Sequence, residues 1–178
     1  MNEILKAQFF VDDLSDDQKT VITDINDYIQ QSLNSDSHSV AIIQGAAGTG
    51  KSVVLMELVR QYMTDKHYKT SLVVNHPELY KAYQDIAESI PNMKVNAIRR
   101  PTSLINYAQK NHKRYDVIFV DEAHLLYSKS EPYAHYRGQN QLTDLMSLAK
   151  VVVAVYDFDQ VFQSKMYWNK KPLYDNIA

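Results

Sequence analysis

Short apolar runs alternate with segments of helical periodicity along most of this chain. The apolar runs are rich in β-branched residues and predict strands at 40–44, 71–75, 94–98, 115–120 and 151–156. Apolar residues spaced three and four apart predict helices at about 15–33, 51–65, 77–90, 102–112 and 140–149. Strands this apolar are typical of a parallel sheet that helices cover on both faces. The pattern therefore predicts an α/β fold, a three-layer α/β/α sandwich with a mostly parallel sheet.

The connections between these segments are short, and we expect a single domain over residues 1–178. The longest loop is expected at 124–139, and the residues after about 163 show no clear period. There is no internal repeat and no long linker, and the length suits one domain.

Composition narrows the class of protein. Apolar residues make up 45% of the chain and charged residues 22%, which is ordinary for a globular domain. The absence of cysteine excludes disulfides, thiolate metal ligands and cysteine nucleophiles. No apolar stretch approaches the ~20 residues that span a membrane, and the N-terminus lacks a signal-peptide pattern. We therefore expect a cytoplasmic protein with no membrane partner.

Charge is unevenly distributed although the net charge is only −2. Residues 1–39 contain eight acidic residues and two lysines, whereas residues 94–114 contain six basic residues and no acid. A basic segment of this kind can form an anion-binding face. The alternative is a solvated basic surface with no ligand.

The first candidate site is a glycine-rich loop between a predicted strand and a predicted helix. It reads Gly45-Ala46-Ala47-Gly48-Thr49-Gly50-Lys51-Ser52, with Val53 as the next residue of the helix. In a loop of this pattern the backbone N–H groups surround the α- and β-phosphates of a nucleotide. Lys51 would reach the β- and γ-phosphates, and the Ser52 hydroxyl would bind Mg²⁺. We predict that residues 45–53 bind a nucleoside triphosphate; the alternative is a turn without a ligand.

The second candidate site follows the apolar strand 117–120, where Asp121 and Glu122 stand side by side. Ionised carboxylates rarely follow a buried strand without partners. Beside a nucleotide, Asp121 would hold Mg²⁺ together with Ser52, and Glu122 would orient or deprotonate the attacking water. The alternative is an acidic pair that stabilises the start of a helix.

Two glutamines are weaker candidates. Gln160 follows the last predicted strand and could sense the γ-phosphate, or it could belong to a simple turn. Gln18 could read the edge of adenine through its amide. It could equally close a capping box with Ser15, because the spacing Ser-x-x-Gln fits that motif.

These motifs, in this order, resemble the first RecA-like domain of superfamily 1 helicases. More narrowly, they resemble the Schlafen-type DNA/RNA helicase domain of bacterial and phage proteins. The resemblance rests on a Leu-x-x-x-Gln helix start, GAAGTGKS, DEAH after an apolar strand, and a strand that ends in DxDQ. It covers most of residues 10–162 and implies a RecA-like P-loop NTPase fold.

The resemblance also implies roles for individual residues. Lys51, Glu122 and Gln160 match catalytic positions, Ser52 and Asp121 match the metal positions, and Gln18 matches the adenine-reading glutamine. Residues 98–104 lie where such helicases often touch the nucleic-acid backbone, which makes Arg99, Arg100, Thr102 and Ser103 candidates. The implied cofactors are ATP and Mg²⁺, and the implied partner is single-stranded DNA or RNA.

The sequence departs from the family pattern in two ways. Leu125 stands where an arginine often follows the DEAH histidine. The chain also ends soon after Gln160, whereas a helicase core needs a second RecA-like domain that supplies an arginine finger. We expect the chain to be an N-terminal fragment of a longer protein, or to work with a second RecA-like domain in trans.

We therefore expect a Mg²⁺-dependent ATPase domain of a helicase-like motor that acts on DNA or RNA and hydrolyses ATP slowly alone. Two other functions fit the same loop: an ATPase switch that remodels a protein partner, and a small-molecule or nucleoside kinase. The Asp121–Glu122 pair argues against the kinase, which needs an acceptor pocket and no water-activating glutamate. A nucleotide-binding module without catalysis is a further alternative.

Overall fold

In a computed structural model of the protein, residues 13–45 and 48–157 are described, and they contain a five-stranded sheet. The strands are β1 (Ser39–Gln44), β2 (Thr70–Val74), β3 (Ile98–Arg99), β4 (Tyr115–Asp121) and β5 (Ala149–Tyr156). They lie in the order β1-β5-β4-β2-β3, and every pair is parallel.

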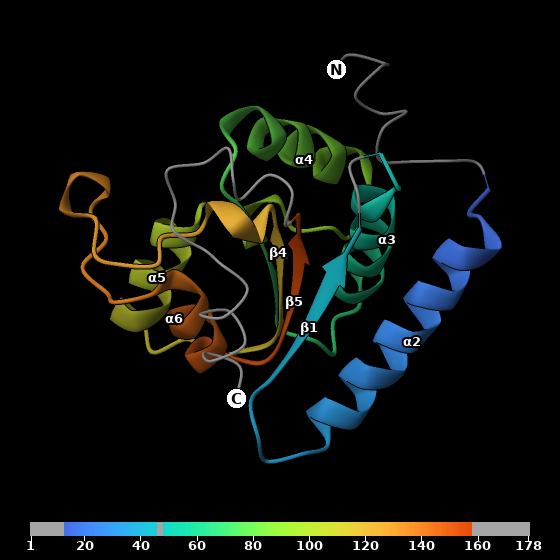
Figure 1. The fold of residues 1–178 in the computed structure, drawn as a ribbon, viewed down its shortest axis with the longest axis horizontal. Coiled ribbons are helices and arrows are strands. Elements are labelled where there is room, and N and C mark those ends of the chain that lie inside the picture. The colour runs from blue at the N-terminus through green and yellow to red at the C-terminus, as the bar shows by residue number, and fades with distance from the viewer. Residues whose placement is uncertain (1–12, 46–47, 158–178) are drawn as a thin grey trace.

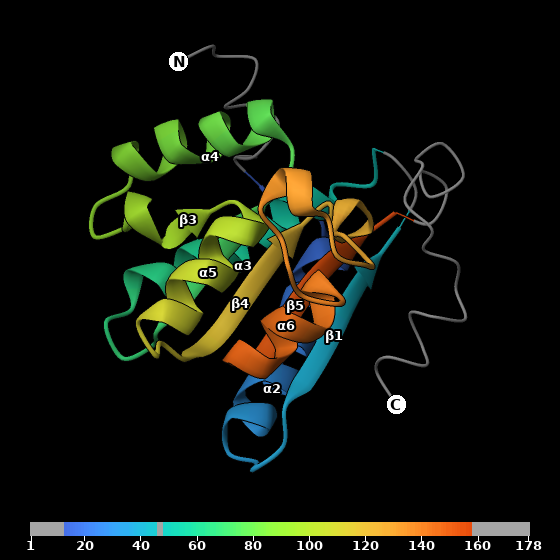
Figure 2. The ribbon, with the colours of Figure 1, turned by 90° about the vertical axis from the view of Figure 1, so that its left-hand side faces the viewer.

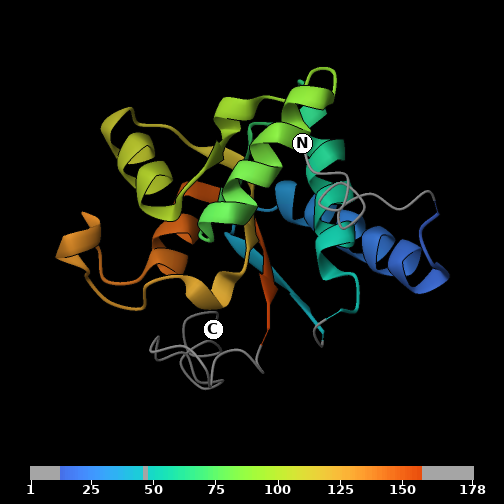
Figure 3. The same ribbon diagram turned by 90° about the horizontal axis from the view of Figure 1, so that it is seen from above.

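Helices cover both faces of this sheet. They are α2 (Asp16–Leu33), α3 (Lys51–Thr64), α4 (Pro77–Ser89), α5 (Pro101–Lys110) and α6 (Gln141–Leu148). Helices α2, α3 and α4 pack on one face and α5 and α6 on the other, which Figures 1 and 3 show from the front and from above. The predicted α/β/α sandwich is confirmed. No helix among the described residues has the length and apolar character needed to cross a membrane.

Successive side chains of a strand point to opposite faces of the sheet, which explains why two helix layers form. Val117 and Phe119 of β4 pack with α2, α3 and α4, while Ile118 and Val120 pack with α5 and α6. All four side chains are fully buried. A parallel strand with apolar residues on both faces must be covered on both sides, so the composition of β4 requires the sandwich.

Helix starts follow the signals in the sequence. Pro77 and Pro101 occupy the first positions of α4 and α5, where a missing N–H costs nothing. Ser15 and Gln18 form a capping box at α2, and the Asn140 side chain accepts from two amides of α6. Predicted and observed helix bounds therefore agree within two residues.

The predicted strand at 94–98 is wrong. Val95–Ala97 is a 3-10 turn, η1, and only Ile98–Arg99 pairs with β2. Val95 and Ala97 are partly buried against the core beside α4. Their apolar character, which suggested a strand, reflects this packing at the edge of the sheet. Two further 3-10 turns, η2 (Ala123–Leu125) and η3 (Pro132–Ala134), lie in the predicted long loop.

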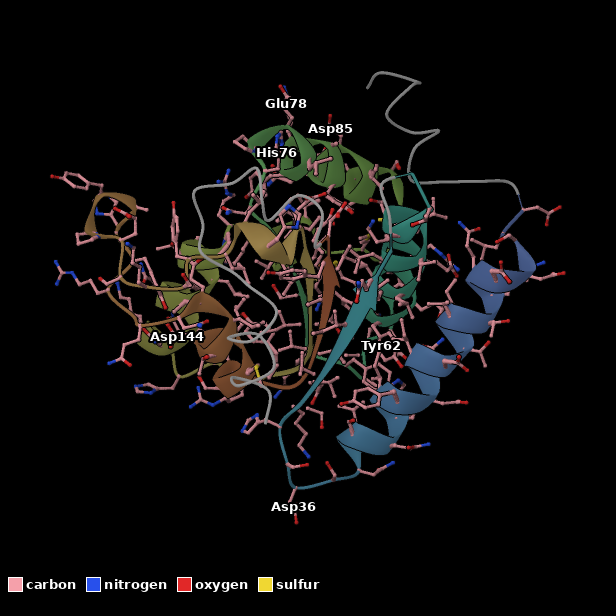
Figure 4. The ribbon with its side chains drawn as sticks, in the orientation of Figure 1. Asp36, Tyr62, His76, Glu78, Asp85 and Asp144 are labelled. Atoms are coloured by element: carbon pink, nitrogen blue, oxygen red, sulfur yellow. The ribbon has the colours of Figure 1, made fainter. Side chains whose placement is uncertain are left out.

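Because the sheet is parallel, all strands start at one edge and end at the other, which we call the amino edge and the carboxyl edge. The strands in Figure 1 point upward, and Figure 2 shows the same direction from the side. Figure 4 places His76, Glu78 and Asp85 at the upper, carboxyl end and Tyr62 low on α3. At the carboxyl edge Gln44 lies opposite Tyr156, and Val74 lies opposite Asp121.

Candidate nucleotide site

The glycine-rich loop connects β1 to α3 at the carboxyl edge. Gly48 and Gly50 have φ angles of 79° and 78°, a left-handed conformation that favours glycine. Gly50 is the N-cap of α3 and makes no side-chain cap hydrogen bond, so nothing on the cap residue competes for the first amides. Such a helix end attracts anions through its free N–H groups and its dipole.

Val53 and Gly45 fix the two ends of this segment. The Val53 amide donates to the Gly50 carbonyl over 3.1 Å, and the Val53 side chain is buried. A Cβ on Gly45 would lie 2.8 Å from Thr49 Oγ1, closer than real Cβ contacts. Glycine at position 45 therefore lets the loop close on itself.

Lys51 is held between the loop and the end of β5. Its ammonium donates to the Gly45 carbonyl oxygen and lies 3.7 Å from Asp157 Oδ2. Both side chains are largely buried, 13% and 5% exposed. The two opposite charges attract each other at this distance. The sequence analysis missed Asp157, although an acid directly after an apolar strand is the same signal that identified Asp121.

Gln18 lies beside the loop and also caps α2. Its Oε1 accepts from the Ser15 amide over 3.0 Å, and its own amide donates to Ser15 Oγ over 3.2 Å. Its Nε2 lies against Gly50, where an added Cβ would collide with it. The capping box is therefore present, and the remaining donor of Gln18 faces the glycine-rich loop.

A cavity of about 480 Å³ opens beside Gln18. Its walls come from α2, β1, the loop and α3, and include Val21, Ile25 and Ile42 as well as Gln18, Thr49 and Lys51. Apolar walls with a few polar groups at one end are typical of a site for a planar ring next to phosphates.

Asp121 ends β4 as a buried carboxylate, 1% exposed. Its Oδ2 accepts from the Tyr83 hydroxyl over 2.8 Å, and its Oδ1 accepts from the Glu122 amide over 3.0 Å. Burial raises the pKa of Asp121 from 3.8 to about 6, although the Tyr83 hydrogen bond opposes that rise. Tyr83 is fully buried on α4, and its role could not be read from the sequence, where it follows the helical period like any core residue.

Glu122 turns the chain away from the sheet in a left-handed conformation, with φ 51° and ψ 49°. This region is uncommon for a residue with a Cβ, and such strain is often found at functional sites. Glu122 Oε2 lies 2.9 Å from Nε2 of the buried His124. The His124 ring meets the Tyr156 ring edge-on, with centroids 5.9 Å apart, so η2 is fixed to the end of β5.

The residues present fit a hydrated Mg²⁺. A carboxylate has about four lone-pair directions, and two of those on Asp121 are used by Tyr83 and Glu122. Mg²⁺ keeps several waters and needs only one or two carboxylates when phosphates are present. Among the described residues, no group of three or more acidic, histidine or cysteine side chains is arranged to hold a metal ion. Asp121, with the partly buried Ser52 hydroxyl, is a suitable donor set.

The four candidate nucleic-acid residues lie together where β3 leads into α5. The Arg99 guanidinium lies 4.1 Å from the centre of the Tyr107 ring. Arg100 Nη2 donates to Asn75 Oδ1 over 3.3 Å, and Thr102 Oγ1 accepts from Gln141 Nε2 over 3.0 Å. Ser103 is exposed on the first turn of α5.

Two amide side chains connect these residues to the chain after Glu122. Asn75 donates to the Leu125 carbonyl over 2.6 Å and accepts from Arg100. Gln141, 1% exposed, accepts from the Tyr127 amide over 2.8 Å and donates to Thr102. The turn that carries Glu122 is thus hydrogen-bonded through two bridges to the start of α5. Sequence reasoning missed both amides, since neither stands in a motif.

Three predicted site residues, Ala46, Ala47 and Gln160, lie outside the described residues. The others lie at the carboxyl edge of the sheet, on the start of α2, the loop from β1 into α3, the end of β4, and the junction of β3 and α5. The nucleotide candidates and the nucleic-acid candidates therefore form two neighbouring groups.

Comparison with known proteins identifies the family of this chain. The X-ray structure of the Legionella pneumophila ATPase DotB aligns with 88% of this chain and 43% of that chain, at 14% identity and a TM-score of 0.40. A likeness this distant supports no conclusion about the site. An uncharacterized protein of Saccharomyces cerevisiae, YPL245W, is 42% identical over 140 residues, which cover 72% of this chain and 31% of that protein. The Schlafen group 3 DNA/RNA helicase domain matches residues 38–178, and the chain belongs to this family.

Proposed function

We propose that this domain binds Mg²⁺-ATP at the carboxyl edge and hydrolyses it. The observation that carries the proposal is that the glycine-rich loop with Lys51 and the acidic pair Asp121–Glu122 both follow strands that end at the carboxyl edge. β5 lies between the strands that lead to the loop and to Asp121, and its own end contributes Asp157. The family match to a helicase domain supports the same class of activity.

Each residue has a role that its position supports. The loop and the first amides of α3 bind the phosphates, and Lys51 leaves Gly45 and Asp157 to neutralise the charge on the γ-phosphate. Glu122 orients the attacking water and accepts its proton. Asp121 and Ser52 hold Mg²⁺, which when bound neutralises charge on the phosphate oxygens. Gln18 and the apolar cavity receive the base.

The work driven by hydrolysis is movement along, or remodelling of, single-stranded DNA or RNA. Arg99, Arg100, Thr102 and Ser103 contact the strand, while Asn75 and Gln141 transmit the state of the Glu122 turn to them. A second RecA-like domain, in cis or in trans, completes the site with an arginine, because such a group adds several decades in rate.

ATP hydrolysis tests the proposal directly. Phosphate release is measured with and without single-stranded DNA and RNA, for the wild type, Lys51→Ala and Glu122→Gln. Lys19→Ala and Glu88→Gln, on exposed faces of α2 and α4, serve as matched controls. We expect both site variants to lose turnover and both controls to keep it. Turnover that survives in Lys51→Ala would exclude this site.

Nucleic acid separates the remaining alternatives. Stimulation that falls as salt rises supports a motor on nucleic acid. Hydrolysis that is indifferent to nucleic acid favours a switch that acts on a protein partner. Phosphoryl transfer to a nucleoside would instead identify a kinase.

A further inference from the structure

A second cavity, of about 310 Å³, lies at the amino edge of the sheet. It opens where α3 ends, where β2 and β4 begin, and beside the later part of α5. Five of the residues that line it are cationic: Lys66, Lys69, Lys94, Lys113 and Arg114. Three more are tyrosines: Tyr68, Tyr107 and Tyr115. We call this cavity the basic pocket.

The positive charge of the basic pocket exceeds the negative charge beside it. All five cationic side chains are exposed, and none forms an ion pair within the described parts of the chain. Two acids nearby offset part of this charge: Asp116 Oδ2 accepts from the Lys69 amide, and Asp65 Oδ1 accepts from His67. Five like charges around one cavity repel one another, and a bound polyanion relieves that repulsion.

The tyrosines give the basic pocket flat apolar walls. Tyr107 is 36% exposed and carries the Arg99 guanidinium on its ring. Tyr68 packs against Tyr62, with ring centroids 5.0 Å apart, and Tyr115 is half-buried at the start of β4. Aromatic rings beside cations are typical of surfaces that stack the bases of a single strand while binding its phosphates.

The basic pocket is separate from the nucleotide site. Tyr115 and Asp121 are the first and last residues of β4, and seven residues of a strand span roughly 20 Å. The pocket is nevertheless connected to the nucleic-acid candidates by one face of α5. Ser103, Tyr107 and Lys110 are exposed at helical spacing between Arg100 and Lys113.

We propose that the basic pocket binds the phosphate backbone of a single-stranded nucleic acid that runs along α5 from Arg100 toward Arg114. The choice of nucleic acid as the polyanion rests on the proposed function. A single strand suits this pocket better than a duplex, because unpaired bases are free to stack on its tyrosines. The nucleic acid would thereby contact the domain at the amino edge of the sheet, opposite the edge proposed to bind ATP.

Fluorescence anisotropy of a labelled oligothymidylate of about 20 nucleotides tests this proposal. The test variant is the triple substitution Lys66→Gln, Lys94→Gln and Lys113→Gln. The control is the triple substitution Lys19→Gln, Lys81→Gln and Lys150→Gln, which removes the same charge from exposed positions outside the pocket. We expect the test variant to bind at least ~10-fold more weakly, with a salt slope smaller by about 2, since each phosphate contact on a single strand contributes about 0.7.

The tyrosines supply a second measurement. Tyr107→Ala should weaken oligothymidylate binding several-fold, whereas Tyr107→Phe, which keeps the ring, should not. Binding of a fluorescent ATP analogue should be unchanged in all of these variants, and this control separates the basic pocket from the nucleotide site.

Three results would overturn the proposal. The first is an equal loss of oligothymidylate affinity in the test and control triple variants. The second is equal affinity of the wild type for heparin and oligothymidylate. The third is that the wild type does not bind oligothymidylate. None of them bears on ATP hydrolysis, so the nucleotide site can stand if the basic pocket fails. Conversely, Lys51→Ala can abolish ATP binding while the basic pocket still binds the strand.

Discussion

The two edges of the sheet carry charge in opposite ways. At the carboxyl edge the charges are few and buried: Asp121 is 1% exposed and Asp157 4% exposed. Each has a specific neighbour, the Tyr83 hydroxyl in one case and the Lys51 ammonium in the other. At the amino edge the charges of the basic pocket are numerous, exposed and without ion-pair partners among the described residues.

This difference separates two kinds of electrostatics. A buried charge acts at short range, costs free energy to desolvate, and depends on the few hydrogen bonds and charges beside it. An exposed cluster acts through its summed field, and salt screens it within about 10 Å at 0.1 M. Substitutions at the carboxyl edge should therefore have large effects that depend little on salt. Those at the amino edge should have graded effects that salt removes.

The largest effect is expected for Glu122→Gln. If Glu122 accepts the proton of the attacking water, its loss should slow ATP turnover by roughly 10²–10⁴-fold. Binding of a fluorescent ATP analogue should stay within a few-fold of the wild type, because glutamine keeps the shape. The ratio of wild-type to variant turnover should stay the same at low and high salt, which would support the contrast between the two edges. Unchanged turnover would remove Glu122 from the mechanism.

Asp121→Asn should stabilise the free protein while it weakens Mg²⁺-ATP binding. Burial raises the pKa of Asp121 from 3.8 to about 6, so the folded protein holds this proton more tightly than the unfolded chain. The stability that protonation contributes is present below pH ~4 and is lost as pH rises through about 6. At pH 7 the ionised group costs about 1–3 kcal/mol, which asparagine avoids.

Urea unfolding between pH 4 and pH 8 measures this effect. The wild type should lose free energy of unfolding across the window from pH 4 to pH 6 relative to Asp121→Asn, and should regain some of it with Mg²⁺-ATP. Parallel pH profiles for the two proteins would show that the Asp121 carboxyl is not destabilising.

Tyr83→Phe should have an intermediate effect. It removes the hydroxyl that donates to Asp121 Oδ2 and leaves the ring in the core. A charge-assisted hydrogen bond of this kind contributes about 1–3 kcal/mol, so the Mg²⁺ concentration for half-maximal activity should rise several-fold or more. Tyr80→Phe, one turn earlier on α4, is the control, because the Tyr80 hydroxyl accepts from Gln84 and, among the described residues, forms no hydrogen bond with Asp121. A shift in kcat alone, with the Mg²⁺ requirement unchanged, would contradict a positioning role.

The smallest effect is expected for Asn75→Ala, which breaks the bridge between Leu125 and Arg100. Basal hydrolysis should change little, while stimulation by single-stranded nucleic acid should fall about 5-fold, which corresponds to the lower end, about 1 kcal/mol, of coupling energies between sites. The exposed neighbour His76 provides a control, His76→Ala. Equal loss of basal and stimulated activity would show that Asn75 supports the site without coupling it to α5.

Local sequence predicted much of this fold because the relevant interactions are local or repetitive. Pro101, Ser15 and Asn140 mark helix starts through backbone chemistry within one turn. The strands β4 and β5 are recognisable because burial on both faces demands continuous apolar residues. The prediction for 94–98 was wrong because Val95 and Ala97 pack against the core beside α4 and do not pair with a neighbouring strand.

The sequence by itself determined the α/β/α class, the glycine-rich loop, and the acidic pair after β4. These features depend on residue type and spacing along one stretch of chain. Only the tertiary structure decided which distant side chains meet: Lys51 with Asp157, Tyr83 with Asp121, and the lysines of three separate segments in the basic pocket. Such contacts join residues far apart in sequence through the strand order β1-β5-β4-β2-β3, and no local pattern encodes that order. Parallel strands place their ends at common edges, so the sheet itself converts separate motifs into two opposed sites.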